Sequence, residues 1–241
     1  MNSLHLLVNC LLFLMLVSPP VTPARSEQSV PCPTYHAYFP ITRTPAPVAI
    51  REAKVVRNRS DHIRVFGEVI LTSSRPVYDA AAEIRIYNDQ NQLLGSFIAP
   101  AFLTATLPGQ LNPFDIVTPI EGRVPHRVAV DMKSWNLESR DIFAPATVVM
   151  SRTVDHTAFG FGVYTEIRND GTAPLTDVEG VAWSLSQEYP SGGATPVTAY
   201  LAPGEVVSAT FPVGMSSVVP PGIDLLSSVK ISVQGKIGTG D

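Results

Sequence analysis

Two segments of the chain carry the same marks at the same spacing. Phe66-Gly67 begins a stretch that ends at Leu107-Pro108-Gly109, and Phe161-Gly162 begins one that ends at Leu201-Ala202-Pro203-Gly204. The first and last glycines are 42 residues apart in both stretches, and the second stretch follows the first at an offset of 95 residues. This offset matches one small β-sandwich and exceeds the roughly 20–50 residues of solenoid repeats. The sequence therefore predicts two similar modules in tandem.

Short alternating segments separated by turn residues fill the chain after Pro47. In residues 63–71 the apolar positions recur at every second residue, which is the period of a half-buried strand. Turn clusters such as residues 72–76, 88–91 and 169–174 separate these segments, and no stripe of helical period interrupts them. We therefore predict an all-β fold of two tandem immunoglobulin-like Greek-key β-sandwiches after a signal peptide.

Five local expectations follow from the same pattern. Ala46-Pro47 and Ala144-Pro145 precede the first strand of each module, and the first strand of the second module covers residues 144–152. Residues 190–193 form a hairpin tip, and residues 225–233 form the last strand. Trp183 lies in the middle of a strand and is expected in the core of the second sandwich.

The N-terminus resembles a secretory signal. An apolar run at residues 6–17 is followed by Ser18-Pro19-Pro20 and by small residues at Thr22 and Ala24. The run is shorter than the roughly 20 residues that span a bilayer, so we expect cleavage and not an uncleaved anchor. A lipoprotein site at Cys10 is disfavoured because the apolar run follows this cysteine. The predicted organisation is a signal peptide at 1–24, a proline-rich leader at 25–46, and sandwiches at 47–140 and 141–238.

Composition and cysteine content narrow the class of protein. After cleavage Cys32 is alone, which excludes an intramolecular disulfide and leaves a spectator thiol or an intermolecular bridge. The net charge is −4, so no nucleic-acid partner is expected, and a membrane contact is expected only if the N-terminal segment is retained. Charge is uneven: residues 47–140 carry 11 basic and 10 acidic side chains, and residues 141–241 carry 4 and 10.

The sequence shows no catalytic, cofactor-binding or metal-binding constellation. It lacks the Gly-x-Ser-x-Gly motif of α/β-hydrolases, and His36, His62, His126 and His156 have no companion at metal-ligand spacing. Asp177 and Glu179 are expected on one strand face, which leaves a carboxylate-pair hydrolase as an alternative. Residues 88–91 are interpreted as a plain turn and not as a calcium loop.

In the first copy, Gly67-Glu68-Val69 is followed by a strand at Ile84-Arg85-Ile86-Tyr87-Asn88. With this strand in place of Phe-x-Leu-Tyr-Asp, the first copy resembles the FxLYD family of small immunoglobulin-like domains in exported prokaryotic proteins, and Gly67-Glu68-Val69 matches the first strand of that pattern. Leu94-Gly95, Leu107-Pro108-Gly109 and Pro113-Phe114 follow in the family's order, whereas the second copy keeps Gly162, Pro203-Gly204 and Phe211. The resemblance covers about 50 residues of each copy and implies an immunoglobulin-like fold and an extracytoplasmic setting, with no established enzymatic role.

These observations predict a secreted or cell-surface, non-catalytic protein with a structural, adhesive or assembly role. The partner is expected to be a protein or a glycan at the cell surface. The alternative from the binding class is a carbohydrate- or peptide-binding module that uses Tyr189 and Tyr200, because aromatic side chains near a hairpin tip can stack on a ligand. The hydrolase is the alternative from the enzyme class.

Overall fold

The computed structural model describes residues 46–57, 62–120, 124–156, 160–185, 191–214 and 225–238. All of these residues belong to one compact unit, Thr34–Asp241. The described residues form antiparallel sheets and a single helical turn, which confirms the predicted all-β sandwich class. The predicted signal peptide, residues 25–45 of the predicted leader, Cys32 and Tyr189 lie outside the described residues.

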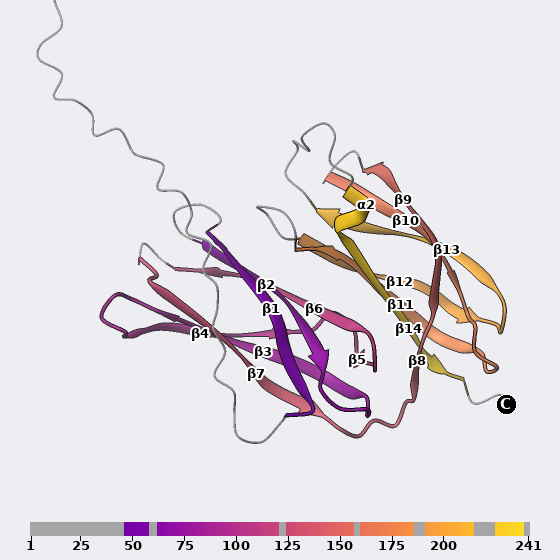
Figure 1. Cartoon of the computed structure of the whole chain (residues 1–241), viewed down its shortest axis with the longest axis horizontal. Helices are drawn as coiled ribbons and strands as arrows, with labels where there is room; N and C mark the ends of the chain where they lie inside the picture. Colours follow the sequence, from indigo (N-terminus) through magenta and orange to yellow (C-terminus); the bar gives the residue numbers. More distant parts are fainter. Residues whose placement is uncertain are drawn as a thin grey trace, which may run out of the picture. The chain divides into compact units, whose positions relative to one another are not determined.

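The first group of strands, here the first module, makes two sheets. The strands are β1 (Val48–Arg57), β2 (His62–Leu71), β3 (Val77–Tyr87), β4 (Leu93–Pro100), β5 (Ala105–Thr106), β6 (Leu111–Pro119) and β7 (Arg127–Asn136). One sheet has the order β1-β2-β6, and in the other β3 pairs with β4, β5 and β7 (Figure 1).

The second group, here the second module, repeats this arrangement. Its elements are β8 (Phe143–Pro145), β9 (Thr147–His156), β10 (Gly160–Arg168), β11 (Leu175–Ser184), β12 (Ser191–Leu201), β13 (Val206–Gly214), α2 (Leu225–Ser228) and β14 (Val229–Ile237). The order β9-β10-β13 corresponds to β1-β2-β6, and β12-β11-β14 corresponds to β4-β3-β7. The strand β8 extends the latter sheet by pairing with β14.

The Pro-Gly turns behave as the sequence predicts. Gly109 and Gly204 have φ of 79° and 74°, in the left-handed region that glycine adopts without steric cost. Gln110 N donates to Leu107 O over 3.0 Å, and Glu205 N donates to Ala202 O over 3.1 Å. Both are therefore type II turns with proline at the second position, in agreement with the rules for that turn.

Each module has its own apolar core. Buried side chains between Val48 and Val130 form one cluster, and those between Ala146 and Val233 form another. In the first module, Gly67 lies so close to the core that an added Cβ would be 2.4 Å from the ring of Phe114. In the second, a Cβ on Gly180 would be 2.7 Å from the ring of Phe211. Glycine at these two positions allows a buried ring to cross the strand.

Three local predictions need correction. Residues 144–152 are not one strand, because β8 and β9 belong to different sheets and separate at Ala146. Gly192 and Gly193 lie within β12 and not at a hairpin tip. Residues 225–228 form the helical turn α2, and the last strand begins at Val229. In the first two cases strand pairing decided the outcome: β8 pairs with β14, and residues 192–193 pair with β11.

The alignment of the two copies also differs from the prediction in the first strands. The β2 strand begins at His62 and β10 at Gly160, which is 98 residues later, as are Pro145 after Pro47 and Asp177 after Asp79. The matched Phe-Gly marks are offset by 95 residues, which is three fewer than 98. Because three is an odd number, a shift of three residues along a strand exchanges its two faces. Accordingly Gly67 faces the core of the first module, whereas Phe161 and Val163, on either side of Gly162, face the core of the second.

Candidate functional site

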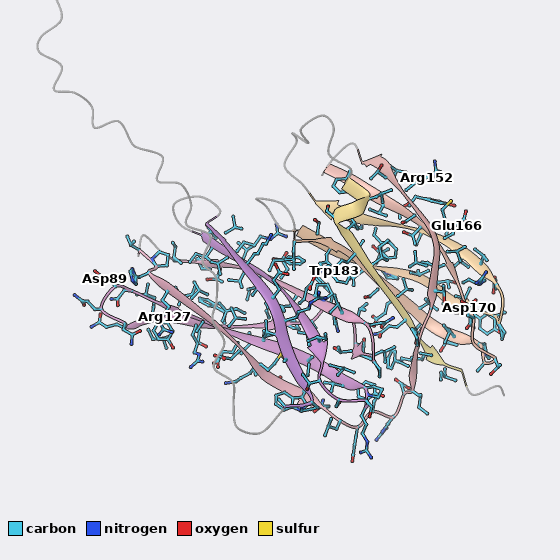
Figure 2. All side chains as sticks on the ribbon, in the orientation of Figure 1. Asp89, Arg127, Arg152, Glu166, Asp170 and Trp183 are labelled. Atoms are coloured by element: carbon cyan, nitrogen blue, oxygen red, sulfur yellow. The ribbon has the colours of Figure 1, made fainter. Side chains whose placement is uncertain are left out.

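The strongest constellation of polar and aromatic side chains joins the two modules. Phe66 and Glu68 lie on the face of β2 that points away from the first core, and both are completely buried. Figure 2 shows Trp183, which extends from β11 of the second module and is 1% exposed. Phe66 and Trp183 belong to one buried cluster with Leu103, Val181 and Leu185. We refer to these residues and Glu68 as the junction.

The position of Trp183 corrects the prediction that this residue fills the core of the second sandwich. On β11, Val178 and Ala182 belong to the second core, whereas Val181 and Trp183 belong to the junction. The tryptophan therefore lies on the outer face of its own sheet and is buried by the first module. Alternation of a strand gives two faces but does not say whether the outer face meets water or another module.

Glu68 is the polar centre of the junction. Its Oε1 accepts a hydrogen bond from Trp183 Nε1 over 2.7 Å and from Lys230 Nζ over 2.5 Å. Its Oε2 is buried without a hydrogen-bond partner among the described residues, and Arg51 Nη1 lies 3.9 Å from it. Trp183 and Lys230 are paired across β11 and β14, so both donors come from one sheet position. Glu68 therefore recognises one register of the second module's sheet.

Backbone and amide contacts extend the junction along the loop before β6. Thr104 N donates to Glu179 Oε1 over 2.8 Å, and Gln110 Nε2 donates to Val233 O over 2.8 Å. Ser232 Oγ donates to Leu111 O over 2.8 Å. Asn112 is buried and holds this loop by bonding to both the N–H and the C=O of Leu103. The first module thus presents a pre-shaped loop to the outer face of β11 and β14.

The buried aromatic side chains and the carboxylate of the junction contribute different amounts to its stability. A buried aromatic side chain removes about 150–250 Å² from water, which corresponds to an upper value of about 4–6 kcal/mol at roughly 25 cal/mol per Å². A hydrogen bond to a charged group contributes about 1.5–3 kcal/mol net. Phe66 and Trp183 therefore dominate the stability of the junction, and Glu68 mainly selects its geometry.

The predicted carboxylate pair is not assembled as a pair. Asp177 has a φ of 47° and lies in an irregularity between Thr176 and Glu179, so the expected alternation is broken. Asp177 is exposed and pairs with Lys236 over 3.2 Å, whereas Glu179 Oε1 accepts from Thr104 N and from Gln234 Nε2. The hydrogen bond from Lys236 to Asp141, followed by that to Asp177, raises the pKa of Lys236. The two carboxylates have separate structural partners.

Asp177 marks a repeat that the sequence reasoning missed. Asp79 has a φ of 52° at the corresponding place in β3, where the pairing with β7 shifts in the same way. Asn136 Nδ2 donates to Asp79 Oδ2 over 2.9 Å, as Lys236 pairs with Asp177 in the second copy. The signal was present as Pro-x-x-Asp, since Pro76 and Pro174 each lie three residues before the aspartate. Aspartate suits this position because it tolerates a left-handed backbone.

The turn at residues 88–91 is confirmed. Asn91 N donates to Asn88 O over 3.1 Å, and Asn91 has a φ of 60°. Asn88 Oδ1 accepts from Gln92 N, and Asn91 Oδ1 accepts from Arg127. These oxygens are therefore occupied by protein donors. No group of three or more histidine, cysteine or acidic residues suited to a metal occurs in the described part of the chain.

A groove of about 490 Å³ lies beside β12. It is lined by Asp177, Val178 and Glu179 of β11 and by residues 194–199 of β12. Tyr200, one of the two predicted ligand-binding residues, is 54% exposed at the next position of β12. Because the acids of the groove are held by Lys236 and Gln234, the groove offers small apolar and hydroxyl side chains and no free acid–base pair.

Comparison with known proteins gives little. No family model matches the chain, and no curated protein matches it. Among solved structures, red sea bream transglutaminase is similar with a TM-score of 0.24 and 11% identity, over 80% of this chain and 30% of that protein. A mutant of Bacillus subtilis oxalate decarboxylase is similar with a TM-score of 0.17 and 7% identity, over 85% of this chain and 74% of that one. The chain thus spans less than a third of the transglutaminase.

Within the described residues, no helix is both long and apolar enough to cross a membrane.

Proposed function

We propose that this is an exported, non-catalytic protein of two immunoglobulin-like modules of the FxLYD type, with a structural, adhesive or assembly role at the cell surface. One observation carries the proposal. Glu68 is the charged side chain that is fully buried among the described residues, and it joins the modules by accepting hydrogen bonds from Trp183 and Lys230. Enzymes place perturbed ionisable groups in clefts where a substrate reaches them. In this chain the buried carboxylate of Glu68 instead holds the two modules together.

The physical consequence is a spacer of defined geometry. A junction with two buried aromatics and a recognised carboxylate keeps the modules in one register, whereas a flexible linker would let them move freely. A protein that displays or connects partners at a fixed separation needs this property. The proposed role therefore follows from how the modules are joined and not from any single surface residue.

Two experiments test the proposal. Cell fractionation with N-terminal sequencing is expected to find the protein outside the cytoplasm with its N-terminus near Arg25. An intact Met1 on a soluble cytoplasmic protein would contradict export. A broad hydrolase panel with the purified protein is expected to show no turnover. Activity that persists through purification and is lost in Glu179→Gln would instead support the hydrolase.

A second function, carbohydrate or peptide binding, is favoured by the exposed Tyr200 beside the groove of β12. An aromatic side chain next to a concave strand edge can stack on a sugar ring while the groove accepts its substituents. A glycan array with wild type and Tyr200→Ala tests this. Val206→Ala, also half-exposed but on another sheet, is the matched control. Binding that is unchanged in Tyr200→Ala would remove Tyr200 from this function.

A further inference from the structure

The junction has an unoccupied counterpart in the second module. At the offset of 98 residues that relates the first strands, Tyr164 takes the place of Phe66 and Glu166 takes the place of Glu68. The pairing irregularities agree: the register of β1 with β2 shifts next to Glu68, and that of β9 with β10 shifts next to Glu166. An aromatic residue and a glutamate two positions later thus recur on the outer face of both three-stranded sheets.

The two faces differ in what covers them. Phe66 and Glu68 are fully buried, whereas Tyr164 and Glu166 are half-buried. Around them, Met150 on β9 is 42% exposed and Val206 on β13 is 48% exposed. Leu111, which takes the place of Val206 in the first module, packs against the junction. The outer face of β9, β10 and β13 therefore leaves an aromatic and apolar surface in contact with solvent.

We propose that this face, centred on Tyr164 and Glu166, is a dimerisation surface that receives the same face of a second copy of the chain. The face carries charges of both signs. Arg152 of β9 lies over the ring of Tyr164 at 4.7 Å. Glu166 lies two residues after Tyr164 on the same face of β10, and Figure 2 labels Arg152 and Glu166. Arg168 is neutralised by Asp170 over 2.5 Å. The two basic and two acidic side chains named here cancel within the face, and in a two-fold arrangement Glu166 of one copy can meet Arg152 of the other.

A two-fold arrangement fits better than a head-to-tail copy of the junction. In the junction, the outer face of β2 meets Val181, Trp183 and Lys230. At the corresponding positions of the first module, Glu83 and Arg85 stand in place of Val181 and Trp183. Arg85 pairs with Asp131, and Lys133 pairs with Glu83. This network of partly exposed ion pairs does not offer Tyr164 the apolar contact that Trp183 gives Phe66. The face of β9, β10 and β13 is left to pair with itself.

The size of the face sets the expected strength. Three strands about 4.8 Å apart and about nine residues long cover roughly 400 Å² per copy. Stable interfaces bury about 800 Å² per partner, and smaller ones are weak or transient. We therefore expect reversible dimerisation with a dissociation constant on the order of 10–100 µM.

Sedimentation velocity on the purified chain tests the proposal between about 1 and about 500 µM, a range that brackets that constant. Wild type is expected to pass from monomer to dimer. Glu166→Arg and Arg152→Glu are each expected to weaken the dimer at least about tenfold, because each places like charges across the two-fold axis. An equimolar mixture of the two variants is expected to restore dimers, since every contact again joins opposite charges. Asp89→Arg, an exposed charge reversal in the first module, is the matched control and is expected to dimerise like wild type (Figure 2).

Folding of each variant is checked by thermal unfolding, and dimers in the mixture require that both variants are folded. A wild type that stays monomeric throughout this range overturns the proposal. A dimer that survives both charge reversals also overturns it, because such a dimer uses another surface. These outcomes leave the proposed spacer function unaffected, since it rests on the junction and on export.

Discussion

The outer faces of the two three-stranded sheets share one residue pattern, but one face is buried and the other is exposed to solvent. The face of β1, β2 and β6 is covered by the second module, and its Phe66 and Glu68 are buried. The face of β9, β10 and β13 has an aromatic residue and a glutamate at the same places, yet Tyr164 and Glu166 contact solvent. The contrast indicates that a neighbouring module, and not the strand itself, turns an outer face into an interior.

The four-stranded sides of the modules show the reciprocal difference. On β3, Glu83 and Arg85 face outward in a network of ion pairs. On β11, Val181 and Trp183 take the same places and bury against the first module. Two charged side chains in one sheet and two apolar side chains in the other distinguish the solvent-facing sheet from the docking face. The two modules therefore have unequal outer surfaces.

The largest difference in the free energy of unfolding is expected between substitutions of the two aromatic residues, Phe66 and Tyr164. Phe66→Ala removes a fully buried ring and is expected to lower the free energy of unfolding by about 3–5 kcal/mol. Tyr164→Ala removes a half-exposed ring and is expected to cost less than about 1 kcal/mol. Urea unfolding at low protein concentration measures both, with Phe66→Leu as the conservative control. Equal losses for the two alanine variants would mean that the faces are not differently covered.

The next effect concerns the two glutamates. Glu68→Gln weakens the charge-assisted bonds from Trp183 and Lys230 inside the junction and is expected to cost about 1–3 kcal/mol. Glu166→Gln changes a residue at the surface and is expected to stay within about 0.5 kcal/mol of wild type. The same unfolding experiment compares them. A larger effect at Glu166 than at Glu68 contradicts the assignment of the junction.

The two Pro-Gly turns have the same conformation in both modules, so equal substitutions in them are expected to have equal effects on stability. Gly109→Ala and Gly204→Ala both force a side chain into a left-handed backbone, and nothing lies within 4 Å of the added Cβ. Both are therefore expected to lose a similar amount, about 1–2 kcal/mol, from conformation alone. Gly109→Asn and Gly204→Asn should lose less, because asparagine tolerates this conformation. A marked inequality between the two alanine variants would indicate different turns.

The smallest effect tests the ion network that replaces the junction face on β3. The hydrogen bond from Ser96 Oγ, over 2.9 Å, is the main cause that lowers the pKa of Glu83, and Lys133 adds to it. A lowered folded-state pKa means that the stabilising contribution is present above the ordinary range of glutamate and is lost as the pH falls through the lowered value. Ser96→Ala is expected to raise the pKa of Glu83 in a carbon-13 NMR titration. Ser96→Thr, which keeps the hydroxyl, is the control, and an unchanged pKa in Ser96→Ala would contradict this cause.

Much of the fold could be predicted because its signals are local. Proline followed by glycine predicts a type II turn wherever it occurs, and both turns form at Gly109 and Gly204. The turn at Asn88 is equally local, since the side chain bonds to its own neighbouring backbone. Alternation also located most strands, including Ile84 and Ile86 facing the first core.

The candidate site could not be predicted in the same way. Tyr200 was selected for its place near a turn, and its exposure agrees with that choice, but its ligand role remains a prediction. Glu68 and Trp183 are 115 residues apart in the chain and meet only through the packing of two sheets. The Phe-Gly marks suggested an alignment that was wrong by three residues, because identical dipeptides carry no information about which face of a strand is buried.

The sequence by itself determined an all-β chain with its turns and strand periods, because these depend on backbone angles and on neighbours a few residues away. Only the tertiary structure decided that Phe66, Glu68 and Trp183 form a buried junction while Tyr164 and Glu166 do not. The physical reason is that burial of an outer sheet face depends on whether a complementary face arrives from elsewhere in the chain. Val181 and Trp183 provide such a face to the first module, and the described residues provide none to β9, β10 and β13.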